Sequence, residues 1–419
     1  MQLLRDILVL IITAVSVLCA IKRPWLGVLA LAVFAYLNPH RYAWGFSTTL
    51  PLYQVVFFAT VLGMVLNPSD RKPFPWTRET ALFVLLLVWF AITTFLTADF
   101  PEAAREQWFK VMKVYVGIFP TFWLITTRER LRWLVLVIAG SFGLVGMKGG
   151  VFAVGTGFSY RVWGPDNTFY GGNNEIALAL CIVLPLILLS AREAGHKYQR
   201  LFFYAMFGLS VCAIISSWSR GGFITLCAVM VFMILAGRRK WLSVPIIAVG
   251  LMVMIPNLPE EWFARMNTIK TYEEDESARN RMAAWRYGYE RALRDPVTGG
   301  GFKTFLAANT GPHSGYFGMA GEHGFVGLGL WLSLIFGTII ALERLRKRVL
   351  LLEEILWIRD YARAFQISLL AYAVGANFIE MTYWDLFYQL VALCVVLKVI
   401  VQEAASRQAA PIYIRKPAT

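Results

Sequence analysis

The stretch IALALCIVLPLILLSA, residues 176–191, contains no charged side chain. A helix that crosses a bilayer needs about 20 mostly apolar residues, and a continuous apolar run of this kind is typical of such a helix. Comparable runs recur along the whole chain, at residues 7–21, 25–37, 50–66, 80–97, 110–126, 131–154, 201–217, 222–236, 241–256, 323–342, 364–380 and 386–402. The sequence therefore predicts an all-α polytopic integral membrane protein with about 12 transmembrane helices.

The exact number of spans depends on the first two runs, residues 7–21 and 25–37, which are short. They could form a thin hairpin, a re-entrant pair or one broken element, so the count is 12 or 13 and the side of the N-terminus stays open. Three regions follow from the pattern of runs. We expect a helical membrane bundle over residues 1–256, a long external loop over 257–321, and C-terminal membrane helices with a tail over 322–419.

The composition excludes a soluble protein. Of 419 residues, 58% are apolar and 16% are charged, against roughly a quarter charged in soluble domains. The net charge of +14 would suit nucleic acid, but the basic residues lie in short clusters between apolar runs, which is how a polytopic protein fixes its orientation. Membrane lipids are therefore the expected partners, and nucleic acid is not.

The basic clusters also predict which loops lie on each side of the membrane. They comprise Arg71, Lys72 and Arg78; Arg128, Arg130 and Arg132; Arg192, Lys197 and Arg200; Arg238, Arg239 and Lys240; and Arg344, Arg346, Lys347 and Arg348. Loops rich in Lys and Arg stay in the cytoplasm. The alternate loops, residues 38–49, 98–109, 155–175, 216–222, 257–321 and 380–385, are then external, facing the periplasm if the protein lies in a bacterial inner membrane.

The longest external segment, residues 257–321, is long enough to form a small folded unit. Beyond Ser277, the residues Ala278, Met282, Trp285, Tyr289 and Leu293 recur at helical spacing, and an Asp-Pro pair at 295–296 ends the pattern. This pattern predicts an amphipathic helix that lies on the membrane face or caps a cavity. The glycines at 299–301 predict a flexible turn after it.

An arginine lies in the short connection between two apolar runs, in SWSRGG at residues 217–222. Charge at membrane depth is costly unless it faces a water-filled cavity or an anion, so Arg220 is a candidate ligand for a phosphate group. The serines and glycines beside it allow a large anion to approach the backbone. The structural alternative is an interfacial arginine that reaches lipid phosphate.

A second candidate group lies in the loop before residue 176. Arg161 stands between aromatic residues in YRVWGP at 160–165, and Asn174 follows at the predicted start of the next helix. Guanidinium groups make bidentate contacts with phosphate oxygens, and carboxamides bind sugar hydroxyls, so the loop is a candidate phosphate and sugar site. The alternative is an interfacial loop capped by Asn174.

The long external segment contributes two further arginine candidates, Arg265 and Arg281. Arg281 precedes Trp285 by one helical turn. Several other arginines of this segment are expected only to solvate the polar helix face or to pair with Glu290. Trp285 and Tyr316 join Asn174 as candidates for contact with an acceptor or a sugar.

One histidine of the external side has the position of a catalytic base. His313 lies in GPHSGY, residues 311–316, bracketed by glycines ahead of an apolar run. Histidine exchanges its proton near neutral pH, so His313 is a candidate general base, the alternative being a loop residue that only forms hydrogen bonds. His40 and His323 are also expected on the external side, where they could merely be polar interface residues.

No metal or other cofactor is expected, because the predicted external side has no clear DxD, no HExxH and no Cys/His cluster. The predicted cytoplasmic side likewise has no phosphate-binding P-loop. The energy for a reaction would then come from the substrate. A sugar linked to a lipid pyrophosphate is already activated, arginines could neutralise that pyrophosphate, and a histidine could deprotonate an acceptor hydroxyl.

Several short motifs together resemble the O-antigen ligase and polysaccharide polymerase superfamily. They are SWSRGG at 217–222, RMAAW at 281–285, GGGF at 299–302, PHSGY at 312–316 and EHGFVGL at 322–328. RPW at 23–25 and NPHRYAWGF at 38–46 are similar, more narrowly, to the putative O-glycosylation ligase branch associated with exosortase systems. By this resemblance Arg220 matches the arginine of the family's SRG motif and His313 its catalytic histidine, which in family members is often followed by Asn, where this chain has Ser314.

The resemblance implies a ligase that moves a glycan from undecaprenyl pyrophosphate to an acceptor hydroxyl, typically lipid A-core oligosaccharide, at the periplasmic face without metal or ATP. Inversion at the anomeric carbon would follow if His313 activates the acceptor for a single displacement. A polymerase or a protein O-glycosylation ligase would use the same donor. A transporter of lipid-linked glycan is the alternative of another class, for which two related halves with broken helices would be expected.

Overall fold

The structure is a computed structural model that describes residues 2–43, 45–237, 252, 255–267, 276–351 and 353–409. Within these ranges the protein is helical, without a β-strand. Seven helices are long and apolar enough to cross a membrane, and three shorter apolar helices accompany them. The all-α polytopic membrane fold is therefore confirmed, while the predicted span at 241–256 lies almost entirely outside the described residues.

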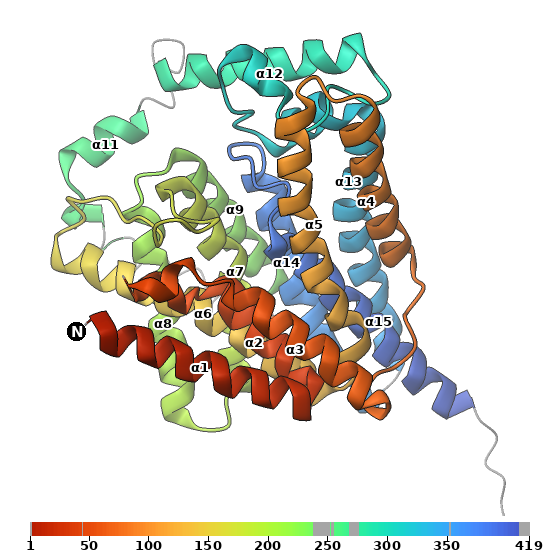
Figure 1. Ribbon diagram of the computed structural model, residues 1–419. Helices are drawn as coiled ribbons and strands as arrows, with labels where there is room; N and C mark the ends of the chain where they lie inside the picture. Colours follow the sequence, from red (N-terminus) through yellow and green to blue (C-terminus); the bar gives the residue numbers. More distant parts are fainter. Residues whose placement is uncertain are drawn as a thin grey trace, which may run out of the picture.

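The α-helices follow in chain order (Figure 1). They are α1 (Gln2–Lys22), α2 (Pro24–Tyr36), α3 (Leu52–Leu66), α4 (Arg78–Leu96), α5 (Pro101–Leu124), α6 (Arg128–Gly155), α7 (Asn173–Glu193), α8 (Lys197–Ile215), α9 (Arg220–Ala236), α11 (Glu260–Asn267), α12 (Glu276–Arg294), α13 (Gly315–Arg348), α14 (Ile358–Gly375) and α15 (Asp385–Ala409). The first two short runs form separate helices, which meet at Arg23 and pack against each other.

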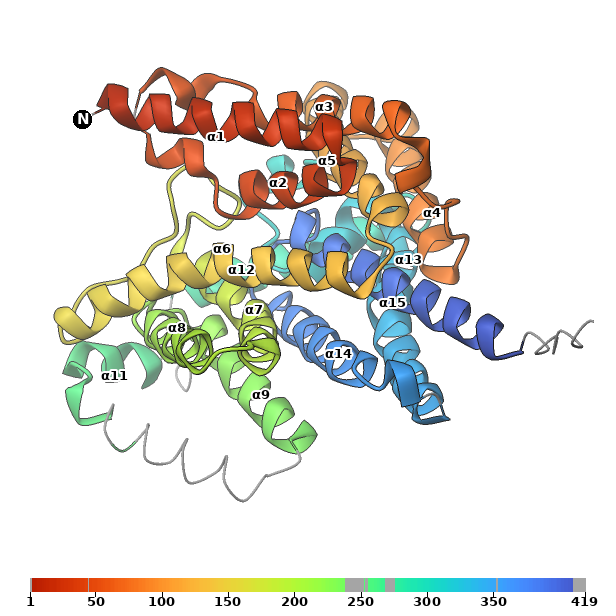
Figure 2. The ribbon, with the colours of Figure 1, turned by 90° about the horizontal axis from the view of Figure 1, so that it is seen from below.

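Helix α7, which contains the apolar stretch 176–191, lies at the centre of the protein. Every residue from 176 to 187 is buried, because α6, α8, α9 and α14 pack around it. A helix that is apolar on all sides is stable only when it is enclosed by other helices or by lipid. Seen from below, α1, α2 and α3 form an outer layer, and α6 separates them from α7 and α8 (Figure 2).

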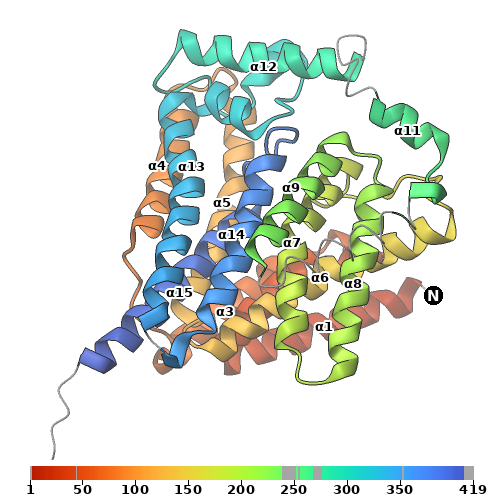
Figure 3. The same ribbon diagram turned by 180° about the vertical axis from the view of Figure 1, so that it is seen from behind.

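The predicted amphipathic helix is α12, which lies across the ends of α4, α5 and α13 (Figures 1 and 3). Most of its apolar stripe does not pack on the bundle. Ala284, Gly288 and Ala292 are buried, whereas Met282, Tyr289 and Leu293 of the apolar stripe are 37–52% exposed. The small residues face the bundle because a Cβ at Gly288 would lie only 2.8 Å from the Phe317 carbonyl oxygen.

The glycines at 299–301 belong to a turn, as predicted, but this turn is buried and hydrogen-bonded to a break in α13. At Gly324 the backbone leaves the helical conformation, with φ 66° and ψ −174°. The N–H groups of Gly300 and Gly301 donate to the carbonyls of residues 321 and 322, at 2.9 and 2.7 Å. The break therefore leaves those carbonyls satisfied, and it attaches the long loop to a membrane helix.

Helix α12 is attached to the bundle by a second contact. The guanidinium of Arg291 donates two hydrogen bonds to Asp99 in the α4–α5 connection, at 2.9 and 2.7 Å. Burial raises the pKa of Asp99, but the hydrogen bonds from Arg291 and Thr304 outweigh that effect and lower the pKa of this carboxyl overall. The pair is a bidentate contact of the strong kind and holds the loop over the membrane helices.

The end of the bundle opposite α12 collects the basic clusters, and we refer to it as the basic end. Ion pairs connect these clusters across the chain: Arg130 with Asp70 at 2.8 Å, Arg128 with Glu193 at 3.5 Å, and Lys72 with Glu403. The predicted orientation requires these clusters to lie on one side of the membrane, and in the structure they lie at one end of the bundle. The cluster at 238–240 lies outside the described residues.

Candidate active site at the α12 end

The first part of the site is the connection between α8 and α9, residues 216–219. Ser217 and Ser219 are buried, and the Ser219 hydroxyl accepts a hydrogen bond from the N–H of Gly222, which caps the start of α9. Trp218 has a left-handed backbone conformation, with φ 57°. A bulky residue in this conformation costs on the order of 1–3 kcal/mol, and such strain is concentrated at functional sites.

Arg220 is the first residue of α9, and it is 9% exposed. The N-terminus of a helix carries a partial positive charge and free N–H groups, which attract anions. A guanidinium at the same position adds a full positive charge in a largely dehydrated environment, where electrostatic attraction is strong. A positively charged group at a helix N-terminus is the chemistry that a phosphate-binding site needs, so Arg220 stays a candidate for that role.

Three other predicted residues meet at this connection, which we call the Arg220 turn (residues 216–222). The Ser219 hydroxyl donates to Asn174 at 2.7 Å, and Arg265 donates from Nε to the Trp218 carbonyl at 2.9 Å. The Arg161 guanidinium lies 5.5 Å from the centre of the Trp218 ring. The structure thus brings together Arg220, Asn174, Arg265 and Arg161, which are up to 104 residues apart in sequence.

The second part of the site is the His313 turn, residues 311–315. His313 is exposed and left-handed, with φ 51°, and lines a pocket of about 480 Å³ between α12 and the segment 308–311. Partial burial and the nearby charge of Arg281 lower the pKa of His313, while Glu175 opposes this change. A histidine with a lowered pKa is neutral at pH 7, which is the form that accepts a proton.

The two turns are connected through one short segment after α14. The Gly315 N–H donates to the Ala376 carbonyl at 2.7 Å, next to His313. Two residues further on, Phe378 packs so closely on Gly221 that a Cβ there would lie 2.6 Å from the Cβ of Phe378. Glu175, whose charge acts on His313, follows directly after Asn174 at the start of α7. The Arg220 turn and the His313 turn therefore belong to one region of the protein.

Two predicted sugar contacts have other interactions in the structure. The Tyr316 hydroxyl donates to the Ala373 carbonyl at 2.8 Å, and its ring packs on Trp331. Trp285 stacks on Phe317, with ring centres 5.4 Å apart, and its buried Nε1 has no hydrogen-bond partner among the described residues. The two contacts join the start of α13 to its neighbours, Tyr316 to α14 and Phe317 to α12.

The structure also reveals a polar network that sequence reasoning missed. The prediction that His323 is a polar interface residue was wrong, because its side chain is fully buried in α13. Its ring nitrogens lie 2.7 Å from Thr93 Oγ1 and 2.9 Å from Tyr383 OH, and Tyr383 donates to Glu322 at 2.5 Å. Buried polar groups need such partners. The EHG sequence at 322–324 was the available signal, but no local pattern indicates Thr93.

A further carboxylate, Glu380, adjoins the His313 turn. A Cβ at Gly318 would lie 3.2 Å from Pro312 and 3.8 Å from the Glu380 side chain. Glu380 retains contact with solvent, but the surrounding protein and the charge of Glu322 raise its pKa. Among the described residues, no three His, Cys, Asp or Glu side chains are grouped so that they could hold a metal ion.

Two families of known sequences match parts of the chain. Residues 205–332 match the family described as O-antigen ligase, and residues 4–195 match a family of unknown function, DUF5935. No curated protein matches the chain. The O-antigen ligase match includes Arg220, Arg265, Arg281 and His313, together with α12 and the first part of α13.

The fold and the match define a membrane glycosyltransferase of the ligase or polymerase type. Residues 205–332, which match the O-antigen ligase family, support placing the chain in the O-antigen ligase superfamily.

Proposed function

We propose that the protein transfers a glycan from undecaprenyl pyrophosphate to an acceptor hydroxyl, in the first instance that of lipid A-core oligosaccharide, at the periplasmic face of a bacterial inner membrane. The observation that carries the proposal is the pairing of two turns across residues 376–378, one with a buried arginine at a helix N-terminus and one with an exposed histidine that lines a pocket. The Arg220 turn suits the binding of a pyrophosphate, and the His313 turn suits the activation of a hydroxyl.

In the proposed reaction, the pyrophosphate of the donor lies at the Arg220 turn. Arg220 binds its oxygens, and Arg161, Arg265 and Arg281 add positive charge around it. As the bond between the anomeric carbon and the pyrophosphate oxygen breaks, the electron pair stays on the leaving undecaprenyl pyrophosphate. Fixed guanidinium groups stabilise that developing charge, which is the usual role of preorganised positive groups in transferases. No metal is needed for this step.

The acceptor enters from the His313 side. Its hydroxyl oxygen forms a bond to the anomeric carbon, and its proton passes to the neutral imidazole of His313. A single displacement of this kind inverts the anomeric configuration. Asn174, Trp285 and Tyr316 are the proposed contacts to the sugar or the acceptor, directly or through the start of α13.

The resemblance to the exosortase-associated branch gives a second choice of acceptor, a protein hydroxyl, and a growing lipid-linked glycan would make the enzyme a polymerase. All three use the same donor and the same two turns. Only transfer to defined acceptors separates them.

The test is transfer by the purified, reconstituted protein from an undecaprenyl pyrophosphate-linked glycan, in EDTA, with lipid A-core, peptide and lipid-linked glycan acceptors in parallel. We expect transfer to lipid A-core with inverted configuration, lost in His313→Ala and Arg220→Ala. His196→Ala, at the opposite end, and Arg286→Ala, whose guanidinium pairs with Glu290 on the exposed face of α12, are matched controls that should keep activity.

Retention of the donor's anomeric configuration would contradict the single displacement. Transfer only to a lipid-linked glycan would make the protein a polymerase. Export of the donor without any glycosidic bond formation would favour the transporter alternative.

A further inference from the structure

A basic pocket lies at the basic end, far from the site described above. It has a volume of about 400 Å³ and is formed by the start of α4 and the final turns of α13 and α15, which pack against one another (Figure 2). Its lining includes Arg78, Arg344, Arg348 and Lys398. Four basic residues from three helices thus face one depression, although they span more than 300 positions of the sequence.

The charge of this pocket is only partly neutralised. Glu79 is the acidic residue in its lining, and this carboxylate is 2.5 Å from Lys398 Nζ, with a side chain that is 2% exposed. In the part of the chain that the structure describes, Arg78, Arg344 and Arg348 form no ion pair, and the weak contact of Arg78 is to the Ser333 carbonyl at 3.4 Å. Three exposed guanidinium groups are therefore available to an anion.

The guanidinium of Arg78 is held in place against α13. It lies over Gly337, where a Cβ would be only 2.5 Å from Nη2. Any larger residue at position 337 would push the arginine away from the helix. Arg344 and Arg348 follow along α13 at a spacing of one turn, so the three groups form a row beside the backbone.

The rest of the pocket is apolar. Ala341, Leu345 and Val401 form its wall, and Trp76 beside it is 75% exposed. Exposed tryptophan is typical of the level where the hydrocarbon core meets the headgroups. A row of arginines beside an apolar wall at that level complements the two parts of a phospholipid. The phosphate would bind the arginines, and an acyl chain would lie along the wall.

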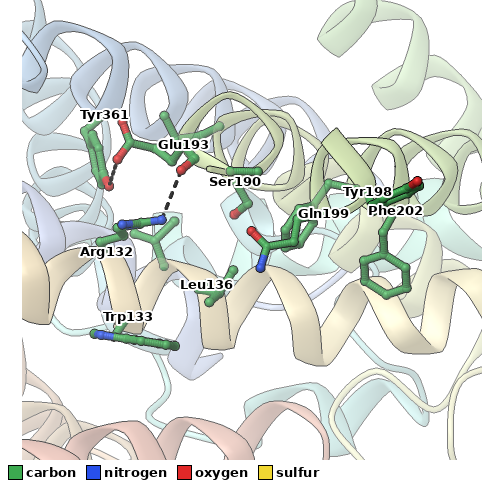
Figure 4. Close-up of a pocket in the computed structure, with 13 residues that line it drawn as sticks. Arg132, Trp133, Leu136, Ser190, Glu193, Tyr198, Gln199, Phe202 and Tyr361 are labelled. Atoms are coloured by element: carbon green, nitrogen blue, oxygen red, sulfur yellow. Dashed lines mark hydrogen bonds between the residues drawn. The ribbon is translucent and has the colours of Figure 1, made fainter. Parts of the chain in front are cut away.

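A second pocket at the basic end lacks these features (Figure 4). It is lined largely by apolar and aromatic side chains of α6, α7 and α8, and its volume is about 460 Å³. Its arginine, Arg132, donates to the Glu193 carbonyl at 3.0 Å, and Glu193 also accepts from Tyr361 at 3.4 Å. The comparison separates a pocket whose arginine is held by a 3.0 Å hydrogen bond from one whose arginines have, among the described residues, at most a weak contact at 3.4 Å.

We infer that the pocket formed by Arg78, Arg344 and Arg348 binds the phosphate of an anionic phospholipid from the adjacent leaflet. Basic pockets between membrane helices are known to hold headgroups with two phosphates. Three guanidinium groups exceed the charge of one phosphodiester, so cardiolipin binds more tightly than phosphatidylglycerol. The bound lipid joins α4, α13 and α15, whose opposite ends carry Thr93, the His313 turn and Tyr383, and so stabilises the bundle beneath the active site.

The test uses the full-length protein purified in detergent, with cardiolipin, phosphatidylglycerol, phosphatidylethanolamine or inorganic phosphate added separately. Native mass spectrometry measures bound lipid, and the thermal midpoint measures stabilisation. We expect both to increase in the order phosphatidylethanolamine, phosphatidylglycerol, cardiolipin, with no effect of inorganic phosphate. Arg344→Gln with Arg348→Gln should weaken cardiolipin binding by about 25-fold, since each basic residue contributes about fivefold.

The matched control is Lys347→Gln with Arg71→Gln, which removes the same charge from the same end without touching the pocket. If this control loses cardiolipin equally, binding is a general charge effect and the inference is wrong. Equal stabilisation by phosphatidylethanolamine, or by inorganic phosphate, would also overturn it. Ala341→Trp provides an independent check, because it fills the apolar wall while every arginine remains, and it should weaken lipid binding too.

Discussion

The two turns of the candidate active site are held in different ways. The Arg220 turn is buried, and it is tied to the α6–α7 loop and the start of α7 by hydrogen bonds from Ser216 to Tyr160, from Trp218 to Phe158 and from Asn173 to Ser217. The His313 turn is exposed at its central residue and lines an open pocket. A phosphate-binding group gains from being fixed before charge develops, whereas a base must leave room for the acceptor. The difference therefore suggests a division between donor binding and proton transfer.

The largest expected effect is that of removing the base. His313→Ala should lower kcat by about 10²–10⁴-fold, the range for general-base catalysis, while the affinity for donor changes little. Single-turnover transfer and donor binding, measured on the same protein, give the two quantities. A His313→Ala enzyme with a normal kcat would assign the histidine a purely structural role.

The second-largest effect tests the planar geometry of the Arg220 guanidinium rather than its charge. Arg220→Lys keeps the positive charge but loses the planar group that contacts two phosphate oxygens, so we expect a loss of about 10²-fold in kcat/KM. Arg286→Lys is the matched control on α12 and should behave as wild type. If Arg220→Lys were fully active, a point charge would be sufficient at this turn.

A third variant tests how much the attachment of α12, which lines the His313 pocket, stabilises the folded protein. Asp99→Asn removes the charge that faces Arg291, and should lower the free energy of unfolding by about 1–3 kcal/mol, measured in detergent. Because the pKa of Asp99 is lowered in the folded protein, its stabilisation is present above its ordinary pKa near 4 and is lost as the pH falls through the lowered value. Asp166→Asn, in the exposed part of the α6–α7 loop, is the control. An Asp99→Asn protein as stable as wild type would make this contact incidental.

The ring of Trp218 gives a smaller effect within the rigid turn. Trp218→Phe keeps an aromatic face near Arg161 but removes the 3.1 Å hydrogen bond to the Phe158 carbonyl. We expect a loss of about three- to tenfold in kcat/KM, equivalent to one hydrogen bond, carried mainly by KM. A change in kcat alone would show that Trp218 acts in the proton-transfer step rather than in donor binding.

The smallest effect concerns the electrostatics between the two turns. Glu175 raises the pKa of His313, so Glu175→Gln should lower that pKa further. The acidic limb of the profile of kcat/KM against pH then moves to lower pH, by less than about one unit. A shift to higher pH would show that Glu175 does not face His313 as described.

Local sequence patterns were enough to predict the helices and to suggest the chemistry of single residues. The apolar stretch of α7, the short connection with Arg220 and the helix α12 were all predicted from the sequence and are present in the structure. Membrane helices are readily predicted because each must satisfy its own backbone within one continuous segment. The candidate residues in turns were indicated by charge at membrane depth and by glycine on either side.

Contacts between distant segments could not be predicted in the same way. His323 meets Thr93 over 230 positions, and Arg291 meets Asp99 over 192. The packed face of α12 could not be predicted, because alanine and glycine contribute little to a hydropathy pattern, although they allow the closest approach. The glycines at 299–301 looked like a flexible turn, since their partner, the break at Gly324, lies in another helix.

The most direct test of the division between the two turns is the affinity for an undecaprenyl pyrophosphate-linked glycan, measured for wild type, His313→Ala and Arg220→Ala in the absence of acceptor. We predict that His313→Ala binds the donor as wild type does but does not transfer it, whereas Arg220→Ala loses at least about tenfold in affinity. Normal donor binding by Arg220→Ala, or an equal loss in both variants, would contradict the account.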